Sequence, residues 1–255
     1  EKASGGKGRL AGSVSSSGSA GTLGFGYFLK DQYPTSKLVA AEALQCPTLL
    51  YNGYGEHRIE GIGDKHIPWI HDCKNTDMVV SVDDDAVVKI VRLFNEPKGR
   101  EYLVSQGVDP EVVSNLGLLG ISCIGNMIGA IKFAKYFELS EDDWVVTVFT
   151  DSMDLYLSRV QELEEEQGAY SEVTAARDHQ TLLDTGLEHL LELGYYDRKR
   201  IHNLKYFTWI EQQGREVSEL NAQWHDHQHY WKGIFSLDSE IDGLIEEFNQ
   251  MIDAV

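Results

Sequence analysis

The sequence predicts an α/β fold, a mostly parallel sheet with helices on both faces, followed by an α-helical C-terminal extension. Strand-like apolar runs alternate with helical patterns along the first 160 residues, which is the order of β-α-β units with parallel strands. A glycine-rich turn separates the first run from the first helical pattern. Beyond residue 160 the chain is acidic and amphipathic with a helical period, and we see no strand-like run there. We therefore expect two domains, 1–160 and 161–255.

The predicted strands are short apolar runs. Residues 9–14 form the first, and residues 37–42 form the second after a helix at 22–29. The run at 78–82 predicts a third strand. Residues 144–149 form a continuous apolar run, which is typical of a strand buried on both faces of a parallel sheet.

The predicted helices begin at capping signals. Asp83–Asp85 supply N-capping acids for a helix through Phe94. Ser122 is placed to cap a helix that ends near Phe137, in which isoleucine and methionine recur at helical spacing. In the C-terminal extension, the helical patterns cover residues 181–193, 198–213 and 240–252.

The composition is that of an acidic globular protein. The 255 residues include 22 Lys and Arg against 41 Asp and Glu, a net charge of −19, which disfavours nucleic acid and anionic membranes as partners. No apolar run approaches the roughly 20 residues that span a bilayer. The cysteines are odd in number and lack C-x-x-C spacing, so we expect a protein of the reducing cytosol. They are Cys46, Cys73 and Cys123.

The histidines and cysteines do not predict a metal site. His225, His227 and His229 alternate, so they share one side only if the segment is extended, whereas its surroundings are helical. Cys73 and Cys123 are expected to be buried as small apolar side chains. We therefore expect no resident metal.

The glycine-rich turn is a candidate anion site. It consists of Gly18, Ser19, Ala20, Gly21 and Thr22. Small residues at a strand-to-helix turn let main-chain N–H groups approach an anion, and the two hydroxyls supply further donors. The net charge does not oppose this, because distant surface charges are screened beyond about 8 Å at physiological salt. A tight turn with close helix packing is the alternative interpretation.

A dinucleotide site is a rival interpretation of the same turn. Glu42 ends the second predicted strand 24 residues after Gly18, near the offset at which an acid binds an adenosine ribose. The turn lacks G-x-G-x-x-G spacing, however, and Gly24–Gly26 falls inside the predicted helix. An NAD-linked oxidoreductase is therefore kept as an alternative.

Four ordered motifs span roughly residues 9–158. They are Gly18–Thr22 with Tyr27–Asp31 and Leu38–Glu42, then His57–Gly63 with Ile67-Pro68, then Gly120–Ser122, and then Asp151–Ser158. In this order they resemble the second half of cysteine synthase and its fold-type-II pyridoxal-phosphate relatives, the tryptophan synthase beta superfamily. The whole chain looks most like a bacterial branch of cysteine-synthase-like beta-subunit proteins.

The resemblance implies positions around a cofactor. The turn Gly18–Thr22 would bind the 5′-phosphate of pyridoxal phosphate, and Gly61 and Gly63 would border the cofactor and the substrate mouth. Asp151, or less readily Ser152, falls where the family places the hydroxyl partner of the pyridine nitrogen. A carboxylate there would favour a protonated ring. Capping of the helix that follows is the alternative role of Asp151.

The segment that carries the Schiff-base lysine and the substrate-carboxylate loop in the family has no counterpart in this sequence. In the family both precede the phosphate loop. No candidate lysine has the expected S-x-K context, and the candidates are Lys2, Lys7, Lys30, Lys37 and Lys65. We therefore expect the chain to be the C-terminal half of a longer enzyme, or one partner of a split enzyme, and catalytically incomplete alone.

The resemblance implies a pyridoxal-phosphate-dependent lyase or β-replacement enzyme that acts on a small amino acid. Lys65 and His66 are candidate substrate contacts, with a surface loop as their alternative. The expected partners are the amino-acid substrate, the missing half or a second chain, and a second copy in a homodimer. The alternative from another class is a non-catalytic α/β interaction or regulatory module that assembles through the acidic extension.

Overall fold

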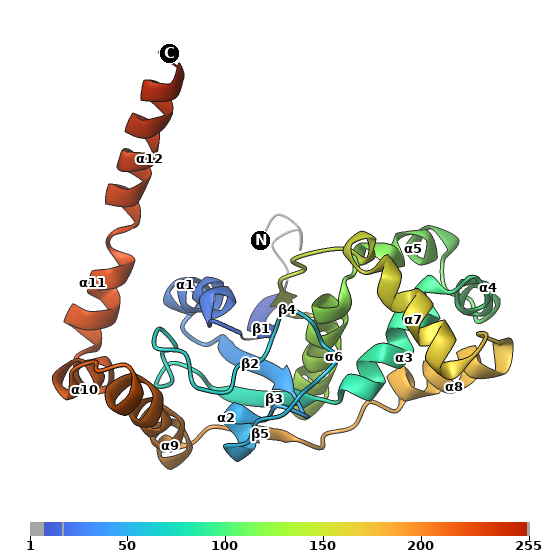
Figure 1. Cartoon of the computed structure of the whole chain (residues 1–255), viewed down its shortest axis with the longest axis horizontal. Helices are drawn as coiled ribbons and strands as arrows, with labels where there is room; N and C mark the ends of the chain where they lie inside the picture. Colours follow the sequence, from blue (N-terminus) through green and yellow to red (C-terminus); the bar gives the residue numbers. More distant parts are fainter. Residues whose placement is uncertain (1–7, 17, 254–255) are drawn as a thin grey trace. The chain divides into compact units, whose positions relative to one another are not determined.

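One sheet organises the first part of the chain. Within residues 8–16 and 18–253, which the computed structural model describes, five strands occur in the order β4-β1-β2-β3-β5 (Figure 1). β1, β2, β3 and β4 pair in parallel, and β5 runs antiparallel to β3. The strands are β1 (Arg9–Ser16), β2 (Lys37–Ala43), β3 (Met78–Val82), β4 (Asp143–Thr147) and β5 (Leu190–Glu192). The predicted α/β class and mostly parallel sheet are confirmed.

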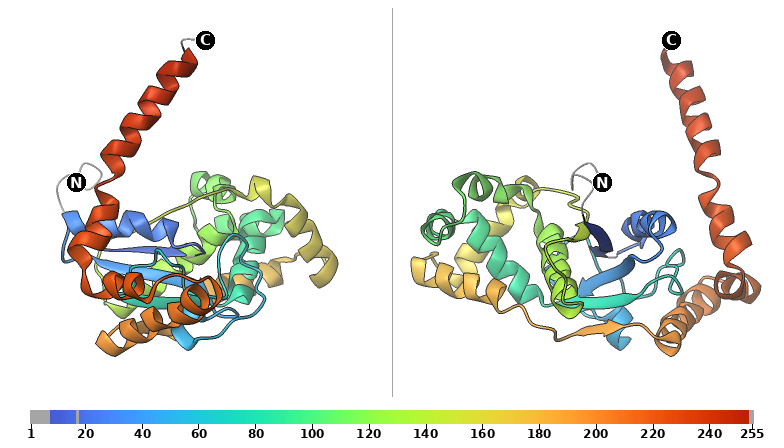
Figure 2. Two further views of the ribbon diagram at one scale, coloured as in Figure 1. Left: turned by 60° about the vertical axis from the view of Figure 1, so that its left-hand side comes forward. Right: turned by 180° about the vertical axis from the view of Figure 1, so that it is seen from behind.

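Helices cover both faces of this sheet (Figure 2). α6 (Ile121–Tyr136) packs against β1, β2, β3 and β4, whereas α1 (Gly24–Gln32) packs against β1 and β2 from the other face. α2 (Thr48–Tyr51) contacts β3, and α3 (Asp84–Asn95) lies against α6. The fully buried core includes Val14, Val39, Val80, Ile90 and Ile124.

Further helices surround α3. It contacts α4, α7 and α8, and its Arg92 side chain, which is buried, donates to the Gly168 carbonyl at 2.8 Å and lies over the Tyr170 ring. The helices are α4 (Pro97–Ser105), α5 (Pro110–Asn115), α7 (Leu157–Gln167) and α8 (Glu172–Leu183). Short 3-10 turns are η1 (Gly21–Leu23), η2 (Leu116–Leu118) and η3 (Met153–Leu155).

The two predicted helix caps have different outcomes. Asp83 caps α3 as predicted, because its carboxylate accepts a hydrogen bond from the Asp85 N–H. The predicted cap of α6 by Ser122 is wrong, since Gly120 occupies the N-cap position in an extended conformation. Ser122 is the second residue of the helix, and its hydroxyl lies 3.4 Å from that of Thr150. This difference matters because it leaves the Ser122 hydroxyl at the end of the sheet.

The prediction that residues 144–149 are buried on both faces is wrong. β4 is an edge strand of the sheet, and its burial alternates along the strand. Trp144 and Val146 are 42% and 37% exposed, and Phe149 beyond the strand is 52% exposed. Among the described strands β4 pairs with β1 alone, and α6 covers one face of it. An apolar run therefore does not by itself distinguish a central strand from an edge strand.

A strand lies beyond residue 160, contrary to prediction. Residues 181–193 were expected to be helical, but α8 ends at Leu183, and Leu190–Glu192 pair with β3 as β5. The compact unit that contains the sheet runs from Glu1 to Ile201. The expected boundary near residue 160 falls inside this unit, because α8 packs on α3 and β5 joins the sheet.

Residues His202–Val255 form a second unit. Its elements, preceded by α9 (Tyr195–Lys205), are the π-helical η4 (Tyr206–Gln212), α10 (Val217–His225), the π-helical η5 (His227–Trp231), α11 (Lys232–Phe235) and α12 (Asp238–Asp253). Lys205 is completely buried and donates to Gln223 at 2.7 Å, and its ammonium lies 5.7 Å from the Trp231 ring centroid. The helix predicted at 198–213 corresponds to α9 and η4, and the helix predicted at 240–252 corresponds to α12.

The cysteines are buried and unbridged, as predicted for Cys73 and Cys123. In the part of the chain that the structure describes, no three His, Cys, Asp or Glu side chains are grouped so as to hold a metal ion. Over the same residues no single helix is long and apolar enough to cross a membrane, although the pair Pro110–Leu118 and Ile121–Tyr136, bent by 120°, passes the same length and composition criteria.

Candidate functional site

The glycine-rich turn lies where β1 ends and α1 begins. Parallel strands bring their carboxyl ends to one edge of the sheet, which is where ligands bind in open α/β folds. Ala20 adopts a left-handed conformation with φ of 66° and is buried, and η1 begins directly after it. Among the residues described, no side chain caps the start of η1 or of α1. Among the described residues, the first N–H groups of these two helices therefore have no side-chain acceptor at the turn.

A cavity of about 100 Å³ opens beside this turn, and we call it the glycine-loop cavity. It has room for several water molecules or one phosphoryl group. Its walls come from the end of β1, the turn, the segment after α2, the start of α6 and the residue after Phe149. They are Ser15, Ser16, Gly18, Ser19, Thr22, Gly61, Ile62, Ser122, Asn126 and Thr150. The structure thus brings Gly18, Ser19, Thr22 and Gly61 together, whereas Ala20 and Gly21 of the same turn are not among the lining residues.

The lining of the glycine-loop cavity is polar but uncharged. Hydroxyl groups predominate, and none of the described residues that line it is an acid or a base. The Thr22 hydroxyl donates to the Ser16 carbonyl at 2.8 Å, which fixes the start of η1 against the end of β1. Neutral donors at a helix start can bind a phosphate without a basic side chain.

Asn126 positions one wall of the cavity, and sequence reasoning missed it. Its side-chain oxygen accepts from the Ser16 N–H at 2.6 Å and from the Ser16 hydroxyl at 2.5 Å, and its amide donates to the Val148 carbonyl at 2.9 Å. This buried side chain therefore joins the ends of β1 and β4 through α6. A single asparagine inside an apolar helix was the available signal, since buried amides need partners.

Gly61 and Gly63 lie in the irregular segment between α2 and β3. Both have positive φ, 80° and 84°, a conformation that favours glycine. A Cβ on Gly63 would lie 2.3 Å from Nε2 of His57, whereas one on Gly61 would meet nothing within 4 Å. Gly61 lines the glycine-loop cavity, but Gly63 lines the adjacent pocket, so the two predicted glycines face different spaces.

Asp151 and Ser152 do not line the glycine-loop cavity. The Asp151 carboxylate accepts from the Tyr156 hydroxyl at 2.6 Å, a hydrogen bond that, with burial, raises the pKa of Tyr156 to about 12, and it also lies 3.4 Å from the Cys123 sulfur. Ser152, not Asp151, caps the helical turn that follows, because its hydroxyl accepts from the Asp154 N–H. Thr150 is the residue of this segment that lines the cavity.

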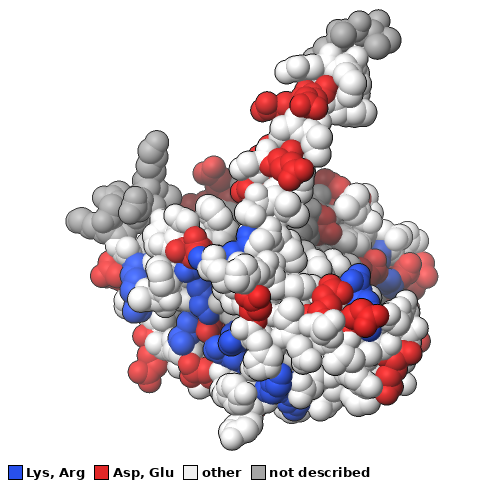
Figure 3. Space-filling model, turned by 90° about the vertical axis from the view of Figure 1, so that its left-hand side faces the viewer, with Lys and Arg blue, Asp and Glu red and all other residues white. Residues whose placement is uncertain are grey.

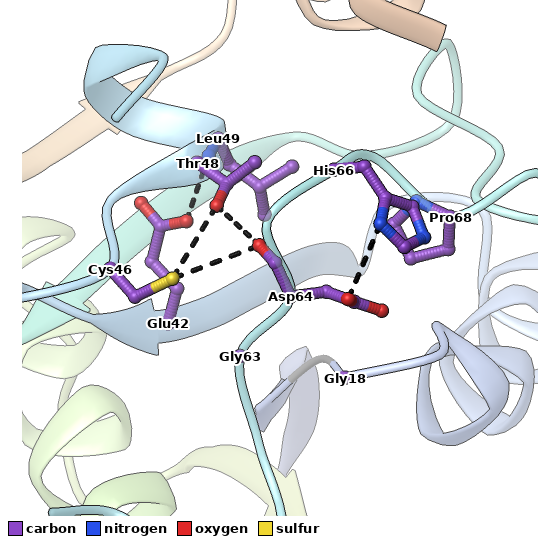
Figure 4. Close-up of a pocket in the computed structure, with 9 residues that line it drawn as sticks. All are labelled: Gly18, Glu42, Cys46, Thr48, Leu49, Gly63, Asp64, His66 and Pro68. Carbon is purple, nitrogen blue, oxygen red and sulfur yellow. Dashed lines mark hydrogen bonds and ion pairs between the residues drawn. The ribbon is translucent and has the colours of Figure 1, made fainter. Parts of the chain in front are cut away.

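A second pocket of about 10 Å³ shares Gly18 with the cavity, and we call it the Glu42 pocket (Figure 4). Glu42 is buried at the end of β2, and its two carboxylate oxygens accept from the Leu49 N–H, the Leu50 N–H and the Ser81 hydroxyl. Burial raises the pKa of Glu42 to about 7, although these three donors oppose the shift. Because both oxygens are engaged inside the protein, Glu42 does not support the dinucleotide alternative.

An outer hollow of about 580 Å³ adjoins the Glu42 pocket, sharing Cys46, Gly63, Asp64 and His66 with it. The Thr48 hydroxyl donates to the Asp64 carbonyl at 2.6 Å, which holds this segment in place, and the Asp64 carboxylate lies 3.4 Å from Nδ1 of His66. Lys65, the other candidate substrate contact, also lines the hollow.

Three of the five lysines considered in the sequence are described by the structure, and each interacts with another side chain. Lys30 is paired with Asp77 at 2.6 Å, Lys37 with Glu192 at 3.2 Å, and Lys65 lies over the Tyr54 ring. Lys2 and Lys7 lie outside the described residues. None of the described three lines the glycine-loop cavity.

Comparison with curated proteins identifies enzymes of sulfur amino-acid synthesis as relatives, although no family model matches the chain. Cysteine synthase from Staphylococcus aureus is 30% identical over 142 residues, 55% of this chain and 40% of that protein. O-acetylserine dependent cystathionine beta-synthase from Bacillus subtilis is 31% identical over 150 residues, 57% of this chain and 41% of that protein. The chain thus spans less than half the length of these relatives.

Comparison with solved structures agrees on the fold. O-acetylserine sulfhydrylase isoform 3 from Entamoeba histolytica superposes with a TM-score of 0.53 at 21% identity, over 73% of this chain and 48% of that one. At this identity the likeness concerns the fold alone. In sequence, the chain is similar to part of a cysteine synthase and part of a cystathionine beta-synthase.

Proposed function

We propose that this chain is the cofactor-phosphate-binding part of a pyridoxal-phosphate-dependent lyase or β-replacement enzyme that acts on a small amino acid. The observation that carries the proposal is the glycine-loop cavity, which is lined by hydroxyls and by a turn whose helix start no described side chain caps, and which lies at the carboxyl ends of parallel strands. The relatives add the reaction class, since their names describe synthesis of cysteine and cystathionine.

The residues present fit the phosphate of this cofactor. The turn would hold it with main-chain N–H groups and the Ser19 hydroxyl, while the Thr22 hydroxyl, which donates to the Ser16 carbonyl, would hold the turn in place. A cavity without charged walls suits a dianion bound by several neutral donors, because an acid there would repel it. When bound, pyridoxal phosphate supplies the electron sink that allows the β-substituent of an amino acid to leave.

Thr150 is the better candidate for contact with the pyridine nitrogen than Asp151. The resemblance gave Asp151, but its carboxylate is held by Tyr156 and turned from the cavity lining, whereas Thr150 lines the cavity beside Ser122. A hydroxyl at this position would leave the ring nitrogen less protonated than a carboxylate would. Asp151 then positions Tyr156 and the start of α6, whose Gly120 N–H donates to the Asp151 carbonyl.

The remaining features of the complete enzyme follow from the same proposal. The lysine that would bind the cofactor covalently and the loop that would bind the substrate carboxylate lie in sequence outside this chain. They belong either to the same polypeptide or to a second one. We propose a cytosolic homodimer, with an O-acetylated serine as the first amino acid to test, because one relative is described as O-acetylserine dependent. Gly61 and the outer hollow that contains Lys65 and His66 lie on the substrate side.

The test uses the natural protein that contains these residues, purified intact and mixed with pyridoxal phosphate. We expect a visible absorbance band from bound cofactor and turnover of O-acetylserine with sulfide. Thr150→Val is expected to shift that band, and Asp151→Asn to leave its position unchanged. A protein that binds no cofactor under these conditions would refute the proposed function, whereas a band shifted only by Asp151→Asn would refute the assignment of Thr150.

A further inference from the structure

The terminal helix α12 presents an apolar stripe that nothing in the proposed function uses. Its described side chains from Asp238 to Ile252 are all exposed. Large apolar residues recur along one side at alternating steps of four and three residues, and their exposure lies between 45% and 62%. With Leu237 just before the helix, they are Ile241, Leu244, Ile245, Phe248, Met251 and Ile252. Such spacing places them on one face of a helix.

Acidic side chains occur along α12 (Figure 3), and the helical period places them on both sides of the stripe. At 3.6 residues per turn, Glu240 and Glu247 border one edge of the stripe, and Asp238 and Asp242 border the other. Glu246 lies on the opposite face of the helix. No lysine or arginine follows Lys232 in the sequence, so the whole helix carries negative charge only.

We propose that α12 docks into a groove of a partner protein that is apolar along its floor and lined by lysine or arginine on both edges. An amphipathic helix is recognised by burying its apolar face in such a groove, and flanking charges select a partner of opposite sign. A contiguous apolar stripe of this size on a soluble protein marks an interaction surface.

The charges disfavour the other occupants of this face. In an antiparallel pair formed with a second copy, Glu240 and Glu247 of the two helices would meet across the interface, and like charges at such positions destabilise a helix pair. Anionic lipid surfaces are disfavoured for the same reason, because an interfacial helix that binds them carries lysine and arginine on its polar face. A partner protein with a basic, apolar groove matches both the apolar stripe of α12 and the acids along its edges.

The test measures binding of two synthetic helical peptides to the natural protein by fluorescence anisotropy. Both peptides carry leucine at heptad positions a and d, and one has lysine and the other glutamate at positions e and g. We expect the lysine peptide to bind with an affinity that falls at least tenfold when salt rises from about 0.05 to about 0.5 M. We expect the glutamate peptide not to bind.

Variants at exposed positions of α12 separate the apolar and charged contributions without affecting the core. Phe248→Gln is expected to weaken binding of the lysine peptide at least tenfold. Glu247→Gln on the stripe edge is expected to weaken it about threefold, whereas Glu246→Gln, the same change on the opposite face, leaves it unchanged. Circular dichroism checks that each variant retains its helix content.

Several outcomes would overturn the proposal. Equal binding of both peptides, or of neither, would exclude a basic groove. Self-association in sedimentation experiments that Phe248→Gln abolishes would assign the face to a second copy. Binding to phosphatidylcholine vesicles that the same variant abolishes would assign it to lipid.

Discussion

The glycine-loop cavity and the Glu42 pocket both include Gly18 in their linings, yet they differ in how their helix starts are satisfied. In the Glu42 pocket, a buried carboxylate accepts from the N–H groups of Leu49 and Leu50 at the start of α2. In the glycine-loop cavity, no described side chain caps η1 or α1. At one helix start a buried side chain of the protein accepts from the N–H groups, and at the other no described side chain does so.

The two helix starts illustrate two roles for the same interaction between N–H groups and an acceptor, one structural and one proposed for ligand binding. N–H groups at a helix start favour an anion in both places. Where a side chain of the protein accepts from these groups, the pocket is about 10 Å³, and the hydrogen bonds stabilise the fold. Where it does not, the cavity is about 100 Å³ and has uncharged walls.

The largest effect is expected from Asn126→Ala. The change leaves the Ser16 N–H and the Val148 carbonyl buried without this partner, at a cost of about 4 kcal/mol in the free energy of unfolding, measured by urea denaturation. Asn115→Ala removes an exposed hydrogen bond to the Glu111 carbonyl and should cost at most about 0.5 kcal/mol. Equal costs for the two variants would contradict the role given to Asn126.

Glu42 is expected to make stability depend on pH. Its folded pKa of about 7 is above the ordinary value of 4.5, so between these pH values the folded protein keeps a proton that the unfolded chain releases. The free energy of unfolding should therefore fall by about 3 kcal/mol as pH rises from about 4.5 to about 7. Glu42→Gln should abolish that fall, whereas Glu101→Gln, at an exposed position, should leave it. A slope that survives in Glu42→Gln would assign it to another group.

Gly63→Ala tests the wall between the two spaces. The alanine would need a positive φ, and its Cβ would meet the His57 ring, so we expect a loss of about 2 kcal/mol in thermal or urea unfolding. Gly107→Ala has a similar φ of 89° but open space around it, and should lose about 1 kcal/mol. Equal losses in the two variants would show that the His57 ring moves away freely.

Thr22→Val gives the smallest effect and the most direct functional comparison. The valine keeps the shape but loses the hydroxyl that faces the glycine-loop cavity and donates to the Ser16 carbonyl. We expect about tenfold weaker binding of pyridoxal phosphate in calorimetric titrations, which is about 1.4 kcal/mol. Thr48→Val makes the same change in the Glu42 pocket and should leave this affinity unchanged. If both variants weakened binding equally, the two sites would not be separate in function.

Sequence patterns predicted the elements that depend on local periodicity. β1, β2 and β3 were apolar runs between turn signals, and the acids at the start of α3 predicted its N-terminal cap. β5 was missed because a strand of three residues is defined by its pairing with β3, which its own sequence does not encode. The edge position of β4 was missed for a similar reason, since an apolar run does not reveal how many neighbours a strand has.

The candidate site was predictable where the backbone determines it. Gly18, Ser19, Thr22 and Gly61 meet in one cavity, because small residues and positive φ mark a turn whatever its neighbours are. Asn126 was not predictable, since its importance comes from partners far away in the sequence. The orientation of Asp151 was likewise decided by the tyrosine five residues later, which competes for its carboxylate.

The outer side of β4 has a practical consequence for work on this chain in isolation. A strand at the limit of a sheet offers unpaired N–H and C=O groups to any extended peptide, and here Trp144 and Val146 add exposed apolar area beside them. A polypeptide of residues 1–255 alone is therefore expected to aggregate at high concentration through pairing of these edge strands.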